Sequence, residues 1–451
     1  MASQDELAEG LDSSKHTKDR AATPQNLNAL WITYLNMVLY ALCFQLQRPV
    51  EPYLVQSLSK HAGGGTADVA LTYGRLQAFF STIQTIGSPL VGILLDRIGI
   101  RKASAIVFLA SAVSYAILAS ADNMSLLFVS KIPTAVQHGF LVAQSMAATS
   151  TAGNDGARAT ALARMTTAYT IGASIGPALG GFLAGKGDLY VSARLAVVGS
   201  LVSVVLSLAF LPNVTKNSSL DAQKGETTSN ITKHIKSQSF WEDLKHQASI
   251  ALQTGLFPLL IVKVVGGVAS SMHSTALPLV LTQELQFAPA LLGLAMSCAS
   301  AAVAAFGAFG IAPMTKWIGP DGLAQSGLMA RVLWGAFLAF LLTSFGNRTM
   351  QNQIIAVIVL HELSSHALAT GLTTQTTGAV TVEEQGALLG LEHGLFSLAR
   401  IAGPPLATLL LTSARTFWAV AAACGSLDLC LVALLLQASD QIKGGQKSKL
   451  K

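Results

Sequence analysis

Two histidines and a glutamate stand in the segment VLHELSSHALATG (residues 359–371), which is otherwise made of apolar and small residues. Such residues could bind zinc, and the protease signature HExxH places its histidines four residues apart on one face of a helix. His361 and His366 are five residues apart, so on a helix they diverge by about 140°. No third ligand lies nearby in the sequence. We therefore expect no metal site, no catalytic residues and no cofactor, and we expect the protein not to be an enzyme.

A second chemistry open to this segment is the binding and release of a proton. Glu362 and His366 are four residues apart and share one face of a helix. A histidine, with an unperturbed pKa of about 6.5, changes its charge in the physiological pH range when it lies beside a carboxylate. We predict that this pair carries a proton, and His138 is a second candidate. The alternative for each histidine is a structural, hydrogen-bonded residue.

Further ionisable residues lie in apolar surroundings, where a charge at mid-membrane costs about 2.5–3.5 kcal/mol. We expect four of them to reach the ends of their segments: Arg48, Glu51, Arg75 and Glu392. Lys263, Glu362, Arg400 and Asp428 lie well inside theirs. For Lys263 and Arg400 we expect a role in a central cavity, or alternatively an ion pair with Asp428 or Glu362.

The composition indicates that these residues lie in a membrane. Of the 451 residues, 51% are hydrophobic and 12% are charged, against about 25% charged in soluble domains. Runs of roughly 20 apolar residues mark membrane-spanning helices. The sequence therefore predicts an all-α, polytopic membrane protein, and it disfavours a nucleic-acid-binding protein. Twelve such runs begin near Ala29, Val69, Ala103, Leu126, Ala159, Ser192, Leu256, Leu291, Leu323, Gln353, Leu388 and Phe417.

Polar segments divide the chain and orient it. Residues 213–250 are too polar to span, so we predict a cytosolic linker with a short interfacial helix between two six-helix bundles, 29–212 and 251–437. Residues 1–28 are expected to be a disordered cytosolic N-terminus, and 438–451 a basic cytosolic tail. Lysines and arginines gather in one set of loops, which places both termini in the cytosol. The plasma membrane and an endolysosomal or vacuolar membrane are both open.

The two halves repeat each other. VGILLDRIG (residues 91–99) follows the second run, and IAPMTKWIG (residues 311–319) follows the eighth. IGASIGPALGGFL (residues 171–183) lies in the fifth run, and LARIAGPPLATLL (residues 398–410) in the eleventh. Two parallel six-helix repeats joined by a long cytosolic linker are typical of rocker-switch transporters.

Three stretches resemble motifs of the major facilitator superfamily. The loop GILLDRIGIRK matches the family's cytosolic motif at Gly92, Asp96, Arg97, Gly99, Arg101 and Lys102. GASIGPALGG matches its antiporter motif at Gly172, Gly176, Pro177, Gly180 and Gly181. Lys131 stands where the family has an embedded arginine. The simpler explanations are a positively charged anchor loop for the first stretch and close helix packing by small residues for the second.

The resemblance implies roles for these residues. It implies that Asp96 takes part in a charge latch of the outward-facing state, with Arg158 as a candidate partner, and that Lys131 is linked to proton transfer. Longer stretches, among them SKIPTAVQHGFLVAQ and LLGLEHGLFSLARIAGPPLATLLL, resemble member eighteen of solute carrier family twenty-two, an organic-cation-transporter-like protein allied to the tetracycline:proton exchangers.

The function we expect is transport of small organic compounds by alternating access, as a proton-coupled antiporter in the lipid bilayer. The expected partners are a small organic substrate and protons, and the protein is expected to be a monomer. The first alternative is a uniporter or symporter for organic anions, because embedded cations outnumber embedded acids. The second is a non-transporting receptor or scaffold, since Lys316 replaces the carboxylate in the second copy of the loop motif.

Overall fold

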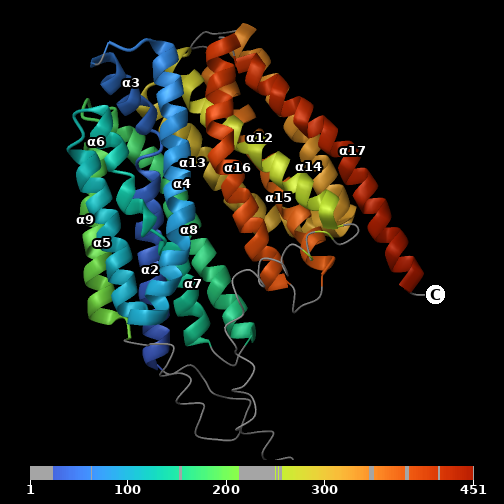
Figure 1. Ribbon diagram of the computed structural model, residues 1–451, viewed down its shortest axis with the longest axis horizontal. Coiled ribbons are helices and arrows are strands. Elements are labelled where there is room, and N and C mark those ends of the chain that lie inside the picture. Colours follow the sequence, from blue (N-terminus) through green and yellow to red (C-terminus); the bar gives the residue numbers. More distant parts are fainter. Residues whose placement is uncertain are drawn as a thin grey trace, which may run out of the picture.

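The first half of the chain forms a bundle of helices, coloured blue to green in Figure 1. The structure is a computed structural model that describes residues 24–61, 63–151, 155–212, 249, 252, 256–344, 350–380, 385–414 and 417–449. The predicted linker and its interfacial helix lie almost entirely outside these residues. The helices of the first half are α2 (Pro24–Gln45), α3 (Glu51–His61), α4 (Thr66–Ile98), α5 (Ile100–Ala119), α6 (Met124–Val129), the short helix η1 (Ile132–Ala135), α7 (Gly139–Ser150), α8 (Asp155–Ala184) and α9 (Val191–Phe210).

The second half forms a bundle beside it, coloured yellow to red (Figure 1). Its helices are α12 (Leu256–Gln283), α13 (Pro289–Ala305), η2 (Phe306–Gly310), α14 (Ile311–Ser344), α15 (Gln351–Gly378), α16 (Gln385–Ala414) and α17 (Phe417–Lys449). The described part of the chain contains no β-strand. The all-α class predicted from the composition is confirmed.

These helices make twelve passes through the membrane. Nine described segments are long and apolar enough to span a membrane, and one of them, Pro289–Leu342, is 54 residues long. That segment changes direction at Gly319, which has a non-helical backbone (φ 73°, ψ 169°), so it makes two passes. The remaining two are α2 and α8. α8 is less apolar because it carries Thr166, Thr167 and Thr170 toward the interior cavity described below.

The repeat seen in the sequence is also present in the backbone. Gly99, between α4 and α5, has φ 79° and ψ 166°, close to the values at Gly319. A positive φ is accessible to glycine because it lacks a Cβ atom. The two glycines of the loop motif and of its degenerate copy therefore make the same sharp turn between successive passes.

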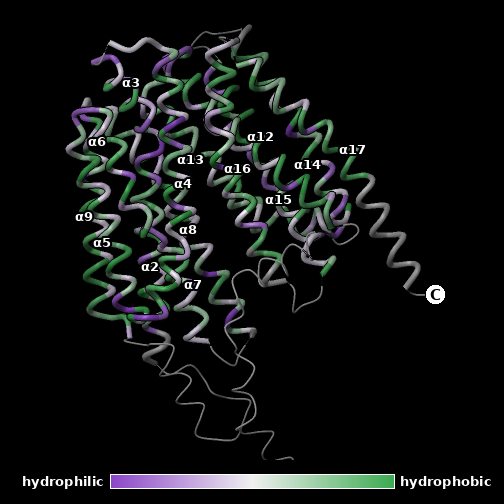
Figure 2. The backbone as a smooth tube through the Cα atoms, in the orientation of Figure 1, coloured by the Kyte–Doolittle hydropathy of each residue, from purple (hydrophilic) through white to green (hydrophobic). Residues whose placement is uncertain are grey.

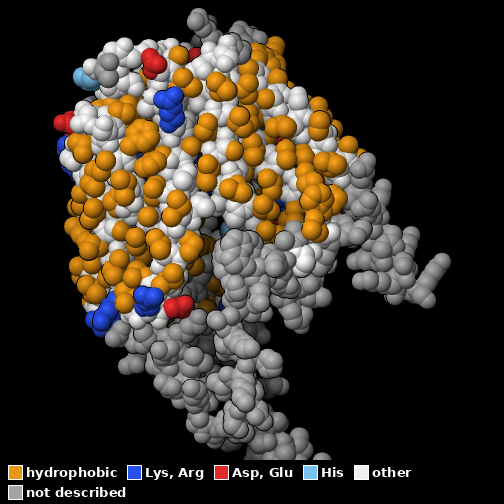
Figure 3. All heavy atoms as spheres, in the orientation of Figure 1, with side chains coloured by type: hydrophobic (Ala, Val, Ile, Leu, Met, Phe, Trp, Pro, Cys, Tyr) orange, Lys and Arg blue, Asp and Glu red, His pale blue; other side chains and the backbone are white. Residues whose placement is uncertain are grey.

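The outer surface of the bundle is apolar, and its inner contacts use small polar residues. On α9 the buried residues include Ser192, Ser200, Ser203 and Ser207, whereas Val205 is 63% exposed. This pattern suits a helix whose outer face contacts lipid, because the small residues on its inner face allow close packing against neighbouring helices. Hydrophobic side chains cover the visible face between its upper and lower charged edges (Figure 3), and green segments cover most of the tube (Figure 2).

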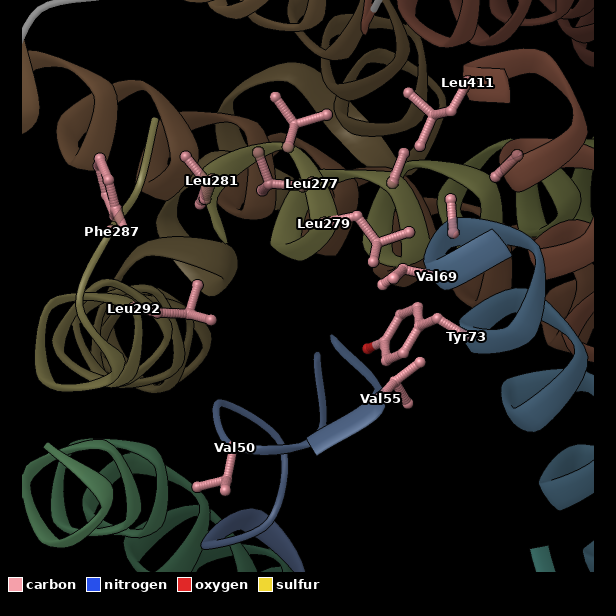
Figure 4. Packing of buried hydrophobic residues seen from close by; sticks show 14 of the residues in the cluster. Val50, Val55, Val69, Tyr73, Leu277, Leu279, Leu281, Phe287, Leu292 and Leu411 are labelled. Carbon is pink, nitrogen blue, oxygen red and sulfur yellow. The ribbon is translucent and has the colours of Figure 1, made fainter. Parts of the chain in front are cut away.

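The two halves are in contact at one end of the bundle. We call the end where α2 begins and α9 ends, the lower end in Figure 1, the linker end, and the opposite end the far end. Near the far end, Tyr53 donates a hydrogen bond of 2.5 Å to the carbonyl of Phe287. The largest buried apolar cluster lies there and joins residues of both halves, such as Val69 and Leu279 (Figure 4). The far end is therefore closed by packed side chains.

Candidate functional site

A cavity of about 1110 Å³ lies between the two halves. We call it the central cavity, and its wall comes from α2, α8, α12, α13, η2 and α15. The backbones of α8 and α13 touch near the far end, at Gly181 and Pro289. The charged and titratable residues that line the cavity are Arg48, Tyr169, Glu362 and His366. On α8 the lining residues run from Ala163 to Ile175, so the cavity lies on the linker side of that contact.

Glu362 and His366 lie together on the wall of the central cavity. Both are half-buried residues of α15, one turn apart, as their spacing predicts. The His366 ring lies edge-on to Phe306, with ring centres 6.4 Å apart. Glu362 is within electrostatic range of Arg48, across the cavity on the other half. A carboxylate and an imidazole thus share one accessible surface in the middle of the protein.

His361 lies on a different face of α15. Its ring is buried and stacks on His273 of α12, with ring centres 3.8 Å apart. The two histidines of the opening segment therefore do not converge. No group of three or more metal-binding side chains occurs among the described residues.

A second, smaller cavity of about 90 Å³ adjoins the central cavity toward the far end, and we call it the polar pocket. Lys131 forms an ion pair there with Glu51, and each side chain is only 12% exposed. Gln77 donates a hydrogen bond of 2.6 Å to the same carboxylate. The expectation that Glu51 reaches solvent at the end of a span is wrong, because the chain turns between α2 and α3 and carries Glu51 inward.

The polar pocket is built at two breaks in membrane-spanning helices. The first pass is interrupted between Gln45 and Glu51, and the fourth between Val129 and Gly139, where Pro133 lies within a short 3₁₀ helix. Such discontinuous helices expose backbone and polar side chains inside a transporter. Lys131 lies at the second break. His138 immediately precedes α7, and its buried Nε2 has no hydrogen-bond partner in the described ranges.

A third cavity, of about 410 Å³, lies between α12, α15 and α16 of the second half. Lys263 and Glu392 form an ion pair of 2.5 Å on its wall, and the Glu392 side chain is 9% exposed. Glu392 lies at the start of the candidate span Leu391–Ser413, as expected, but its side chain is largely buried in this pair. Lys263 lines this cavity and not the central cavity where we expected it, and the alternative, an ion pair with Asp428 or Glu362, is wrong. The two partners were not matched from the sequence, because they lie on helices four passes apart.

Asp428 is buried in the core of the second half. The Arg331 guanidinium donates two hydrogen bonds to its carboxylate, one of them 2.7 Å long from Nε to Oδ2. Arg331 also donates to Ser270 Oγ at 2.6 Å and to the carbonyl of Gly266 at 3.3 Å. The adjoining space is about 10 Å³, room for one water at most. The structure therefore brings Asp428 together with Arg331, away from the central cavity.

Arg400 lies on α16 and is not among the residues that line the central cavity. It is half-buried and lies within electrostatic range of Arg48, Tyr40 and Tyr169, which belong to the other half. Its expected ion pair with Asp428 or Glu362 is absent from the described part of the chain.

The glycines of the antiporter motif lie at two helix contacts. A Cβ atom on Gly172 or Gly176 would come within 2.4–2.6 Å of α2, and one on Gly180 would lie 2.1 Å from the carbonyl oxygen of Leu46, just after α2. A Cβ atom on Gly181 would lie 2.2 Å from the carbonyl oxygen of Pro289 in the other half. In α16, the corresponding Gly403 packs on Ser271 of α12. The motif therefore holds α8 against its own half and against the second half at the far end.

Gly181→Leu is expected to lower the transport rate by more than about tenfold. The larger side chain would press against the backbone of the other half, and such overpacking costs about 1–3 kcal/mol. The state that is closed at the far end would be destabilised by that amount. Uptake by reconstituted vesicles measures the effect. Gly394→Leu is the matched control, since a Cβ atom there meets no atom within 4 Å. Equal rates for the two variants would show that far-end closure does not depend on this contact.

The loop motif lies at the linker end. Asp96 and Arg97 are exposed at the end of α4, and Lys102 is exposed in α5. Arg101 donates a hydrogen bond to the carbonyl of Leu208 in α9. A Cβ atom on Gly92 would meet no atom within 4 Å, so that face of α4 is open in this conformation. The pairing of Asp96 with Arg158 stays a prediction.

Several polar residues of these sites carried no signal in the sequence. Gln47 has a buried amide group whose nitrogen and oxygen have no hydrogen-bond partner among the described residues. His273 and Gln137 are likewise buried, and Gln137 donates to the hydroxyl of Tyr115 at 2.8 Å. The breaks in the first and fourth passes could have pointed to Gln47 and Gln137, since both lie within them.

Comparison with known proteins places the chain in a family. Residues 33–320 match the model of the Major Facilitator Superfamily. The chain is 28% identical over 394 residues to solute carrier family 22 member 18 of Rattus norvegicus, covering 85% of this chain and 87% of that one. It is 25% identical over 393 residues to the class C tetracycline resistance protein of Escherichia coli, covering 87% and 91%.

A solved structure has the same fold. The human organic anion transporter MFSD10 (TETRAN) superposes with a TM-score of 0.61 at 19% identity, over 92% of this chain and 100% of that one. Together with the apolar passes and the cavity between two repeated halves, these matches identify the molecule as an integral, multi-pass membrane transporter of small molecules. The chain belongs to the Major Facilitator Superfamily.

Proposed function

We propose that this protein transports small organic compounds by alternating access and couples their movement to a proton at Glu362 and His366. The observation that supports the proposal is the position of these two side chains on the wall of the central cavity. A group that binds both proton and substrate must be accessible from one side at a time. The cavity lies on the linker side of the contacts that close the far end, as a state open toward the linker end requires.

Proton antiport is the mode that the antiporter motif and the similarity to a tetracycline resistance protein support. In this mode a cationic substrate and a proton compete for the same carboxylate. Ionised Glu362 binds the cation, and protonated Glu362 does not. Binding of the cation therefore releases a proton into the solution on that side.

Anion transport by symport or uniport is the second candidate, and a specific observation favours it. Three embedded acids, Glu51, Glu392 and Asp428, are already paired with Lys131, Lys263 and Arg331. Arg48 and Arg400 form no ion pair in the described part of the chain. A structure with the same fold is described as an organic anion transporter. A bound anion near Glu362 stabilises the protonated form of its carboxyl group. The protein therefore takes up a proton when the anion binds.

The sign of the proton flux separates the two candidates. We expect purified protein in weakly buffered detergent to release protons on binding a cation, or to take up protons on binding an anion. A pH-sensitive dye records the change during titration with a panel of organic cations and anions. Binding without any proton change would favour a uniporter, and no binding by any compound would favour the receptor or scaffold alternative.

We also propose the topology that the charged loops indicate. The linker end faces the cytosol, the bundles comprise residues 29–212 and 251–437, and the protein acts as a monomer in a plasma or endolysosomal membrane. The loop motif around Asp96 then acts as a latch on the cytosolic side. At the plasma membrane, an epitope tag inserted into the 213–250 segment is expected to bind antibody only after cells are permeabilised.

A further inference from the structure

Among the described residues, two embedded arginines form no ion pair. The embedded cations are Arg48, Arg75, Lys131, Lys263, Arg331 and Arg400. Within the described residues, Lys131, Lys263 and Arg331 each form an ion pair, and Arg75 is exposed on α4. Arg48 and Arg400 remain, and a charge in this environment is costly unless it is paired or solvated. Glu362 is within electrostatic range of Arg48, and an anion from outside the chain would neutralise the remaining positive charge.

The two arginines come from opposite halves of the transporter. Arg48 follows α2 and lines both the central cavity and the polar pocket. Arg400 lies on α16 and is within electrostatic range of Arg48 and of Tyr169, which also lines the central cavity. Like charges on facing halves oppose closure of the empty cavity. A single anion between them would offset that repulsion.

The side chain of Gln47, next to Arg48, offers a second reason to expect a ligand at this place. Gln47 precedes Arg48 and lines the polar pocket, and its residue is 8% exposed. Both its amide nitrogen and its amide oxygen are buried and have no hydrogen-bond partner within the part of the chain that the structure describes. Buried amide groups are normally satisfied. A head group with acceptor oxygens, or a water that accompanies it, would satisfy the nitrogen beside Arg48.

The two adjoining cavities differ in character. The polar pocket is lined by Gln77, Thr134 and Gln137, and its volume of about 90 Å³ suits a head group of a few atoms. The central cavity is much larger, and it presents Ile171 and Leu277 among other apolar residues. Arg48 lies at the junction, because it lines both. Together the cavities suit a molecule with one polar end and an apolar body.

We propose that Arg48 and Arg400 bind the carboxylate or phosphate of an amphipathic organic anion, and that this anion draws the two halves together. The inference rests on the proposed transport function and favours its second candidate, the transport of organic anions. The apolar body of the substrate lies in the central cavity. Glu362, which is within electrostatic range of Arg48, competes with the anion for that arginine while it is ionised. A protonated Glu362 therefore accompanies the bound anion.

Binding of four probes with one skeleton tests the charge of the ligand. The probes are 4-phenylbutyrate, 4-phenylbutyl phosphate, 4-phenylbutanamide and 4-phenylbutylamine, titrated calorimetrically into the full-length protein in detergent. We expect the acid and the phosphate to bind at least tenfold more tightly than the amide and the amine. Tighter binding of the amine, or no binding of either anion, would overturn the proposal.

Substitution of the arginines tests the site itself. Arg48→Gln and Arg400→Gln are each expected to weaken anion binding at least tenfold, and Arg400→Lys to restore part of it. Arg194→Gln is the matched control, because Arg194 is exposed and paired with Asp188 at 2.9 Å. Unchanged anion binding in both glutamine variants would contradict the assignment. Thermal melting of each variant separates a loss of binding from a loss of folding.

A lipid could supply the same anionic chemistry, and a further measurement distinguishes the two sources. Nanodiscs with and without phosphatidylglycerol are compared for thermal stability and for probe binding. We expect soluble anions to bind equally in both. The proposal of a soluble substrate would be overturned by two results together. The anionic lipid would stabilise the protein in a way that depends on Arg48 and Arg400, and none of the probes would bind. If anion binding depends on the arginines but no proton moves, the proton coupling proposed above fails and the anion site stands.

Discussion

Asp428→Asn is expected to lower the free energy of unfolding by about 3–5 kcal/mol, the range for removing one partner of a buried ion pair. Asp428 and Arg331 are 2% and 4% exposed, so both groups are almost fully buried. The asparagine keeps the shape of the side chain and removes its charge. Arg331 then retains only neutral acceptors, which are the asparagine amide oxygen, Ser270 Oγ and the carbonyl of Gly266. The stacked rings of His273 and His361 beside it supply no negative charge.

Two variants make this prediction specific. Asp188→Asn breaks the exposed pair with Arg194, whose side chain is 61% exposed, and is expected to change stability by about 1 kcal/mol or less. The double substitution Arg331→Met with Asp428→Leu removes both charges and is expected to recover most of the loss. Reversible unfolding in mixed detergent micelles measures all three. A stability of Asp428→Asn equal to that of the wild type would show that the pair contributes nothing.

Glu362→Gln is expected to abolish the proton coupling of transport. If one proton moves with each substrate, the substrate dissociation constant changes by up to tenfold per pH unit between the relevant pKa values. The glutamine keeps the shape of the side chain on the cavity wall and removes its titration. Its dissociation constant is therefore expected to be nearly independent of pH. The sign of the slope in the wild type also distinguishes a competing cation from a cooperating anion.

Matched variants separate coupling from binding. Glu362→Asp keeps a carboxyl group and is expected to retain the pH dependence. Asp188→Asn removes an exposed carboxylate that lines none of the three cavities described above. His366→Gln tests whether the imidazole shares the proton, in which case the slope falls without vanishing. An unchanged slope in Glu362→Gln would remove this residue from the mechanism. Calorimetric titrations at several pH values provide the measurement.

The turns and close contacts of the fold were predictable because they depend on consecutive residues. Apolar runs marked the passes, and the repeated glycines at Gly99 and Gly319 marked equivalent turns that need a positive φ. The small residues of the GASIGPALGG stretch marked close helix packing, which the structure has between α8 and α2. These features follow from local backbone conformation and from the hydropathy of short segments, which are properties of neighbouring residues.

The sequence by itself determined that ionisable residues lie inside the membrane and that Glu362 and His366 share a helix face. Only the tertiary structure decided which charges neutralise one another, since Lys131 and Glu51 are 80 residues apart and Arg331 and Asp428 are 97 apart. It also decided that Arg48 and Arg400, from opposite halves, come within electrostatic range of each other. The reason is physical: an ion pair depends on the rotation and depth of two packed helices, and neither quantity is encoded in the spacing along one of them.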